Sequence, residues 1–267
     1  MTTIKTSTLR VPGASLYYET RGSGPVLLMI PPGAGDARSF NGIVNHLAAQ
    51  YTVVTYDRRG CSHSKIDDPA EDVRVETHSD DARCLLATLT NEPAYVFGSS
   101  AGALIGLDLA IRYPEQVRAL VAHEPPVQHL LPEAKQPKNI QEIYRRDGAV
   151  AALQKLMVQV GVSYDDREPG VELPQPNEQS AANSQAFFAY TLQAVQRYTL
   201  DIAALSATPT RIVLAGGSTG QEYIGYRCAA AVANLLGTSV VEFPSHHAGF
   251  VSHPRAFSER LREVLNA

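Results

Sequence analysis

The sequence has few of the features that mark a membrane-spanning or disulfide-linked protein. Its three cysteines, Cys61, Cys84 and Cys228, lie far apart, so neither a disulfide framework nor a metal motif can be read from them, and reduced thiols are expected. No stretch approaches about 18 consecutive apolar residues, which excludes a transmembrane helix. The first ten residues are polar and lack the apolar stretch of a secretory signal. We therefore expect a cytoplasmic protein with no membrane partner.

An excess of basic charge is also absent. The 23 Lys and Arg residues against 27 Asp and Glu residues give a net charge of −4, which argues against a nucleic-acid partner. Apolar residues make up 44% of the chain, enough to bury a core and to exclude extended disorder. The length of 267 residues suits one large α/β domain with an insertion. Whether the chain forms a homodimer stays open at this stage.

Strand and helix patterns alternate over most of the chain. Two alternating segments, Lys5–Val11 and Ser15–Arg21, flank a Pro12-Gly13 turn and predict a β-hairpin. Further strands are predicted at Val26–Ile30, Thr52–Tyr56, Ala94–Phe97, Val117–Ala122, Arg211–Ala215 and Val240–Phe243. Amphipathic or buried helices separate them. Strands separated by helices need crossover connections, so the sheet should be mostly parallel and covered on both faces.

The alternation stops between Pro125 and about Thr208. Helical patterns at Gln141–Gln159 and Ser184–Tyr198 occupy this block, which contains no clear strand. We interpret 125–208 as a helical cap inserted after the sixth strand, with 1–124 and 209–267 forming the core.

A nucleophile motif follows the strand at Ala94–Phe97. The segment Gly98-Ser99-Ser100-Ala101-Gly102 matches G-x-S-x-G and leads directly into the helix from Ala101. This strand–turn–helix context places the serine on a strained turn with its hydroxyl exposed. A glycine-rich phosphate loop is the alternative, but neither of its usual signatures is present. We therefore predict Ser100 as a nucleophile.

With these motifs, the chain from Val26 onward resembles an α/β-hydrolase with a cap domain. It resembles more narrowly the zearalenone-lactonase-like branch, through His123-Glu124-Pro125 and through His247 followed by Phe250-Val251-Ser252-His253-Pro254. The resemblance implies hydrolysis of a carboxylic ester or lactone, with a histidine base after the last strand. It requires no metal and no organic cofactor. An aspartate nucleophile is disfavoured because Ser100 fills the elbow.

The base and the acid each have two candidates. The resemblance aligns His247 with the base, and the adjacent His246 is the alternative. The family usually places the acid after the seventh strand, where this chain offers no aspartate and only Glu222. The other family position follows the sixth strand, where Glu124 stands. We favour His247 and Glu124.

The remaining site residues would stabilise the oxyanion and contact substrate. Motif mechanics predict one N–H donor from Ala101 and a second from Gly33 or Ala34, in the loop after the third strand. Phe187, Phe188 and Tyr190 of the cap are predicted to line an apolar substrate pocket for a small hydrophobic ester or lactone. A C–C bond hydrolase, a cofactor-free perhydrolase and a non-catalytic ligand receptor on the same fold are the alternatives.

Overall fold

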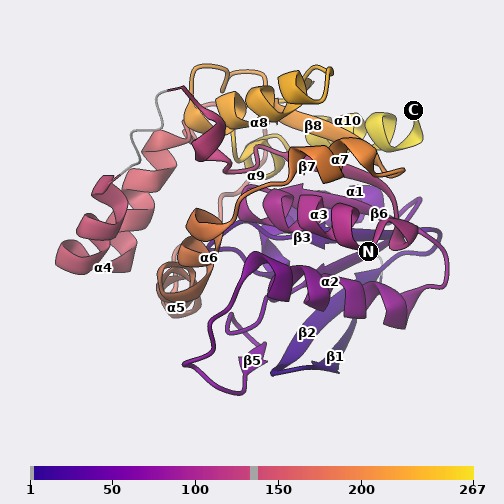
Figure 1. Cartoon of the computed structure of the whole chain (residues 1–267), viewed down its shortest axis with the longest axis horizontal. Coiled ribbons are helices and arrows are strands. Elements are labelled where there is room, and N and C mark those ends of the chain that lie inside the picture. Colours follow the sequence, from indigo (N-terminus) through magenta and orange to yellow (C-terminus); the bar gives the residue numbers. More distant parts are fainter. Residues whose placement is uncertain (1–2, 133–137) are drawn as a thin grey trace.

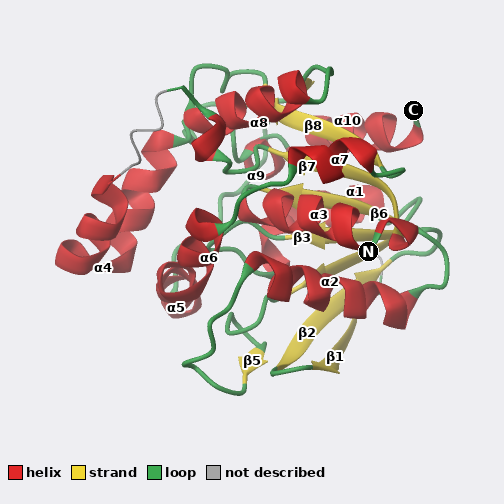
Figure 2. Ribbon diagram, in the orientation of Figure 1, coloured by secondary structure: helices red, strands yellow, loops and turns green. Residues whose placement is uncertain are grey.

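A nine-stranded sheet runs through the centre of the protein (Figures 1 and 2), in a computed structural model that describes residues 3–132 and 138–267. The strands are β1 (Lys5–Val11), β2 (Ala14–Arg21), β3 (Val26–Ile30), β4 (Thr52–Tyr56), β5 (Lys65–Ile66), β6 (Ala94–Ser99), β7 (Val117–His123), β8 (Arg211–Gly217) and β9 (Val241–Phe243). Their order is β1-β2-β4-β3-β6-β7-β8-β9, and β5 pairs with β2. Strand β2 pairs antiparallel with β1, β4 and β5, whereas the strands from β4 to β9 along this order pair in parallel. The predicted mostly parallel sheet is confirmed.

Helices cover both faces of the sheet (Figure 2). The flanking helices are α1 (Asn41–Leu47), α2 (Val75–Leu89), α3 (Ala101–Arg112), α8 (Ile224–Leu235), α9 (Gly249–Ser252) and α10 (Pro254–Asn266). In β3, Leu28 and Ile30 pack into the core with α2, α3 and α8. Leu27 and Met29 of the same strand pack into the core with α1 and α10. Because successive side chains of a strand point to opposite faces, a strand covered on both sides must be apolar throughout, as β3 is.

The segment inserted after β7 is helical. It carries α4 (Lys138–Gln159), α5 (Glu178–Ala186), a π-helical turn (Phe187–Thr191), α6 (Leu192–Arg197) and α7 (Ile202–Ala207). Figure 1 shows α4, α5 and α6 together beyond one end of the sheet. Helix α4 is broken at Gly148, whose φ of 86° is not helical. We call the part that carries α4 to α6 the cap.

The last helix of the insertion packs with the core. Helix α7 contacts α3, and Leu205 is buried in the same apolar cluster as α3. Sequence patterns did not predict α7, and they did not predict the two-residue strand β5. Both are short elements whose positions depend on contacts with distant parts of the chain.

The loop between α4 and α5, residues 160–177, is tied to the core and is called the strap here. Glu168 in the strap accepts hydrogen bonds from the backbone N–H groups of Arg255 at 3.1 Å and Ala256 at 2.8 Å. These amides form the first turn of α10, where a carboxylate is favourable. Burial raises the pKa of Glu168, but these hydrogen bonds outweigh it and hold the pKa below its ordinary value. The strap is therefore fixed to the segment that follows β9.

No helix within residues 3–132 and 138–267 is long and apolar enough to cross a membrane.

His123, the last residue of β7, is expected to make the fold sensitive to acid. It is fully buried among Phe97, Phe243 and Phe257, and neither ring nitrogen has a hydrogen-bond partner among the described residues. Burial lowers the pKa of His123 from 6.5 to about 4. The unfolded chain therefore binds a proton that the folded protein excludes, so the stability that this neutral ring contributes is present above pH 6.5 and is lost as pH falls toward 4.

Replacing His123 by phenylalanine should therefore reduce this pH dependence. The loss of unfolding free energy between pH 7 and pH 5 should become smaller by about 2 kcal/mol. Urea unfolding at both pH values measures the difference. His46→Gln, at an exposed position, serves as the control and should keep the wild-type dependence. An unchanged slope in His123→Phe would contradict the prediction.

Candidate active site

Ser100 stands on a sharp turn between β6 and α3. Its backbone adopts φ 54° and ψ −120°, a left-handed conformation that is costly for a residue with a side chain. The Ser100 amide donates to the His123 carbonyl at 2.8 Å, which fixes the turn at the end of the sheet. Ser100 lines a cavity of about 1470 Å³. The turn therefore presents the hydroxyl at the carboxyl end of β6, as the motif predicts.

The two glycines of the motif permit this turn by close backbone contact. A Cβ atom on Gly98 would lie 2.3 Å from the Gly102 carbonyl oxygen. A Cβ on Gly102 would lie 2.2 Å from the carbonyl oxygen of Ile30, in the neighbouring strand. Neither position can therefore accept a side chain without moving backbone, which explains the G-x-S-x-G spacing.

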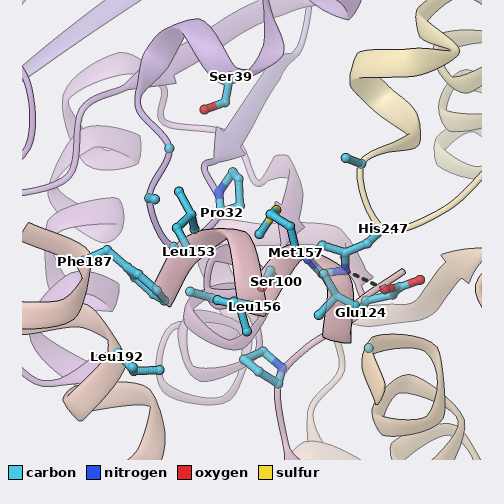
Figure 3. A pocket seen from close by; sticks show the side chains of 18 of the residues that line it. Pro32, Ser39, Ser100, Glu124, Leu153, Leu156, Met157, Phe187, Leu192 and His247 are labelled. Carbon is cyan, nitrogen blue, oxygen red and sulfur yellow. Dashed lines mark hydrogen bonds and ion pairs between the residues drawn. The ribbon is translucent and has the colours of Figure 1, made fainter. Parts of the chain in front are cut away.

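His247 and Glu124 meet beside Ser100. His247 Nδ1 lies 2.5 Å from Glu124 Oε2, and Figure 3 shows this pair next to Ser100. Both side chains are buried, and both line the same cavity as Ser100. Of the two predicted acids, the structure brings Glu124 to the histidine. Glu222 is exposed in a turn before α8 and does not line the cavity.

Local backbone geometry aims Glu124 at His247. Glu124 has a φ of 52°, which turns the chain sharply at the end of β7. Its second oxygen, Oε1, accepts the Gly217 amide at 2.9 Å. Burial raises the pKa of this carboxyl, but the hydrogen bond to His247 and the Gly217 amide outweigh it, so the pKa is lowered and the group stays a carboxylate. A Cβ at Gly225 would lie 2.2 Å from Oε2, so α8 can approach the pair only with glycine there.

His246 points away from this pair and holds the strap. Its Nδ1 accepts the Ala248 amide at 3.1 Å, which leaves Nε2 to donate to the Ser163 carbonyl. Burial lowers the pKa of His246, so the ring is neutral. Of the two adjacent histidines, the structure therefore gives His247 the carboxylate partner and His246 a bond between the strap and the core.

The loop after β3 completes the floor of the cavity. Gly33 and Ala34 line it together with Ser100 and Ala101, so the three predicted oxyanion donors and the nucleophile face one space. Arg58 donates to the carbonyl oxygens of Pro31, at 3.0 Å, and Gly33. This loop, residues 31–36, is called the oxyanion loop below.

Of the three predicted cap aromatics, only Phe187 lines the cavity. Its ring covers Gly33, where an added Cβ would lie 2.3 Å from Phe187 Cε2. Phe188 instead stacks on Tyr144 with ring centroids 4.8 Å apart, and Tyr190 lies near Gly60. The structure therefore does not support substrate contacts for Phe188 and Tyr190. The π-helical turn at Phe187–Thr191 changes the angle between these side chains from that of an α-helix.

A polar contact between the cap and the oxyanion loop was missed from sequence. Asn183 of α5 is buried and donates to Asp36 Oδ2 at 3.0 Å, and its Oδ1 accepts the Ser62 amide at 3.0 Å. The Ser62 hydroxyl donates to the same Asp36 oxygen at 2.7 Å. These residues lie 121 and 147 positions apart from Asn183 in the sequence, and no local pattern marks the contact.

The cavity has a volume of about 1470 Å³ and a mixed lining. The apolar residues that the cap contributes include Leu153, Leu156, Met157, Val160, Phe187, Leu192 and Val195. Polar lining residues come both from the segment after β3 and from the cap, and include Asp36, Arg38, Ser39, Asn177, Ser180 and Asn183. Figure 3 shows Leu153, Leu156 and Met157 around Ser100. No group of three His, Cys, Asp or Glu side chains within the described ranges is arranged to hold a metal ion.

Comparisons with known proteins agree with this architecture. The family model of the α/β hydrolase fold matches residues 25–206. An uncharacterized hydrolase of Bacillus subtilis strain 168, YraK, is 46% identical, and the match covers 98% of this chain and 97% of that protein. A zearalenone hydrolase of Cladophialophora bantiana is 26% identical over 98% of this chain and 96% of its own length.

A solved structure shows the same fold at low sequence identity. Est816, described as an N-acyl homoserine lactone degrading enzyme, is 18% identical and superimposes with a TM-score of 0.75, covering 96% of this chain and 99% of its own. Together with the family match and the relative at 46% identity, the sheet order and the elbow at Ser100 lead to one conclusion. The chain belongs to the α/β-hydrolase fold family.

Proposed function

We propose that the protein hydrolyses a carboxylic ester or lactone by a Ser100–His247–Glu124 triad. The observation that carries the proposal is the 2.5 Å contact between His247 Nδ1 and Glu124 Oε2, beside a serine held at positive φ in the same cavity. This contact holds the proton on Nδ1 and leaves Nε2 free to act as the base. Relatives described as zearalenone hydrolases support an ester or lactone substrate.

The chemistry follows from these positions. His247 Nε2 takes the proton of Ser100 while Oγ attacks the carbonyl carbon, and the Glu124 carboxylate stabilises the imidazolium. The negative oxygen is stabilised by N–H groups of Ala101 and the oxyanion loop. His247 then protonates the leaving alkoxide, and water releases the acid by the reverse sequence. The hydrogen bond between the nucleophile and its base commonly tightens only when substrate binds.

The proposal is tested by labelling and turnover together. A fluorophosphonate probe should modify one serine, which peptide mapping should identify as Ser100. A substrate panel should contain p-nitrophenyl esters of several chain lengths, macrolactones, a diketone, and a carboxylic acid supplied together with hydrogen peroxide. Hydrolysis of esters or lactones supports the proposal. Turnover of the diketone or peracid formation alone would favour a C–C hydrolase or perhydrolase, and binding without labelling or turnover would favour a receptor.

Exchanging the acid for its amide should separate the two carboxylate candidates. Glu124→Gln keeps the shape but presents an N–H to His247 Nδ1, which favours the wrong tautomer. We expect kcat on one ester to fall by roughly 10³- to 10⁴-fold. Glu222→Gln, at an exposed position outside the cavity, is the matched control and should keep wild-type kcat. If instead Glu222→Gln lost activity and Glu124→Gln kept it, the acid would lie after β8.

A further inference from the structure

Arg58 lies beneath the oxyanion loop and outside the cavity. Its side chain is completely buried, follows β4, and does not line the space that substrate would enter. Nη1 donates to the Pro31 carbonyl at 3.0 Å, and Nη2 donates to the Gly33 carbonyl. Arg58 therefore has no place in the substrate cavity, but it holds a loop that borders this cavity.

The hydrogen bond to Gly33 fixes the direction of one peptide group. The carbonyl of a residue and the N–H of the next residue point in opposite directions across a trans peptide bond. Because the Gly33 carbonyl is directed down to Arg58, the N–H of Ala34 is directed away from Arg58, on the cavity side. No backbone–backbone turn or loop hydrogen bond within residues 3–132 and 138–267 uses this N–H, or that of Gly33, as donor.

The direction of the Gly33 N–H group is determined by a different hydrogen bond. This N–H shares its peptide group with the Pro32 carbonyl, which accepts the Gly35 amide at 2.9 Å and closes a tight turn. The turn therefore determines the direction of the Gly33 N–H, and Arg58 does not. Of the two loop amides that the motif allows, only that of Ala34 is aimed by a buried cation.

Resting on the proposed function, we propose that Arg58 is a positioning residue that makes Ala34 N–H the second oxyanion donor, beside Ala101. The guanidinium fixes the Gly33–Ala34 peptide group before substrate arrives. It also polarises that group, because a charged donor on a carbonyl oxygen strengthens the N–H at the other end. The expected effect is on the transition state, where the negative oxygen forms, rather than on substrate binding.

Single-atom changes in the backbone test the donor directly. Nonsense suppression with L-lactic acid at position 34 replaces the Ala34 N–H by an ester oxygen and keeps the side chain. We expect kcat on a p-nitrophenyl ester to fall by roughly 10²- to 10³-fold with KM nearly unchanged. Glycolic acid at position 33 removes the N–H of the competing candidate donor on the same loop, and it should lower kcat less than the change at position 34. A larger loss at position 33 than at position 34 would overturn the proposal.

Two adjacent buried arginines test the role of Arg58. Arg59 is also buried, but it binds Asp81, at 2.7 and 2.8 Å, and Glu71 instead of the loop. Arg59→Met should therefore lower the Tm without lowering kcat in the folded protein. Arg58→Met should lower kcat by about tenfold or more at nearly constant KM, and added guanidinium ion should restore part of kcat to Arg58→Ala.

The outcomes separate this inference from the proposed function. Wild-type protein without Ser100-dependent turnover would overturn both. Ser100-dependent turnover that survives lactic acid at position 34, or equal kcat in folded Arg58→Met and wild type, would overturn only the role given to Arg58 and Ala34. If Arg58→Met fails to fold, the pair of backbone substitutions still decides the question.

Discussion

Replacing Ser100 by alanine is expected to reduce kcat on a p-nitrophenyl ester by roughly 10⁴- to 10⁶-fold. The variant loses the nucleophile, whereas the oxyanion donors and the cavity stay in place and account for the residual rate. Folding should survive, because the Ser100 side chain faces the cavity and the turn is held by backbone contacts at Gly98 and Gly102. Stopped assays with purified protein, together with circular dichroism, measure both quantities.

Ser99→Ala is the matched control for this change. Ser99 precedes the nucleophile, is completely buried, and its hydroxyl has no hydrogen-bond partner among the described residues. Its loss should therefore leave kcat close to the wild-type value. Near-normal turnover by Ser100→Ala would refute the proposed mechanism as a whole, whatever the substrate.

Replacing His247 by alanine should have an effect of similar size. The variant lacks the imidazole that is proposed to accept the Ser100 proton, and no other side chain in the described site takes its place beside Glu124. We therefore expect kcat to fall by roughly 10⁴- to 10⁶-fold. Steady-state kinetics on one ester measure the effect.

His246→Ala is the control that the chain itself offers. The neighbouring ring bonds to the Ser163 carbonyl of the strap and to the Ala248 amide, so its loss should weaken the strap and lower the Tm. Most of kcat should remain. A variant of His246 that is as inactive as His247→Ala would show that the base had been assigned to the wrong neighbour.

Much of the fold and the turn that carries Ser100 could be predicted, because both depend on residues close together in the sequence. Strand β3 is apolar at every position since both of its faces are covered, and the elbow needs glycine on each side of Ser100 because backbone atoms meet there. The sequence alone left Glu124 and Glu222 open. Both follow buried strands, and only the positive φ at Glu124 together with the Gly217 amide shows which carboxylate reaches His247.

Contacts between distant segments could not be predicted. Neither the bond from Asn183 to Asp36 nor that from Arg58 to Gly33 leaves a periodic trace in the sequence. The prediction that Phe188 and Tyr190 line the cavity was not supported for a different reason. A regular helix would place Phe187 and Tyr190 on one face, but the π-helical turn at Phe187–Thr191 changes the angle between successive side chains.

The position of Glu124 limits how such an enzyme can exchange its cap during evolution or in the laboratory. Glu124 directly follows β7, and the helical segment comes next in the chain, so the proposed catalytic carboxylate lies at the junction between the sheet and the inserted helices. Where the acid instead follows β8, recombination can replace a cap without touching the triad. In a chimera that carries a foreign cap, the N-terminal joining point must therefore lie beyond Pro126, so that the backbone turn at Glu124 is preserved. The C-terminal joining point, near Thr208, is not constrained in this way, because no residue of the proposed triad lies there.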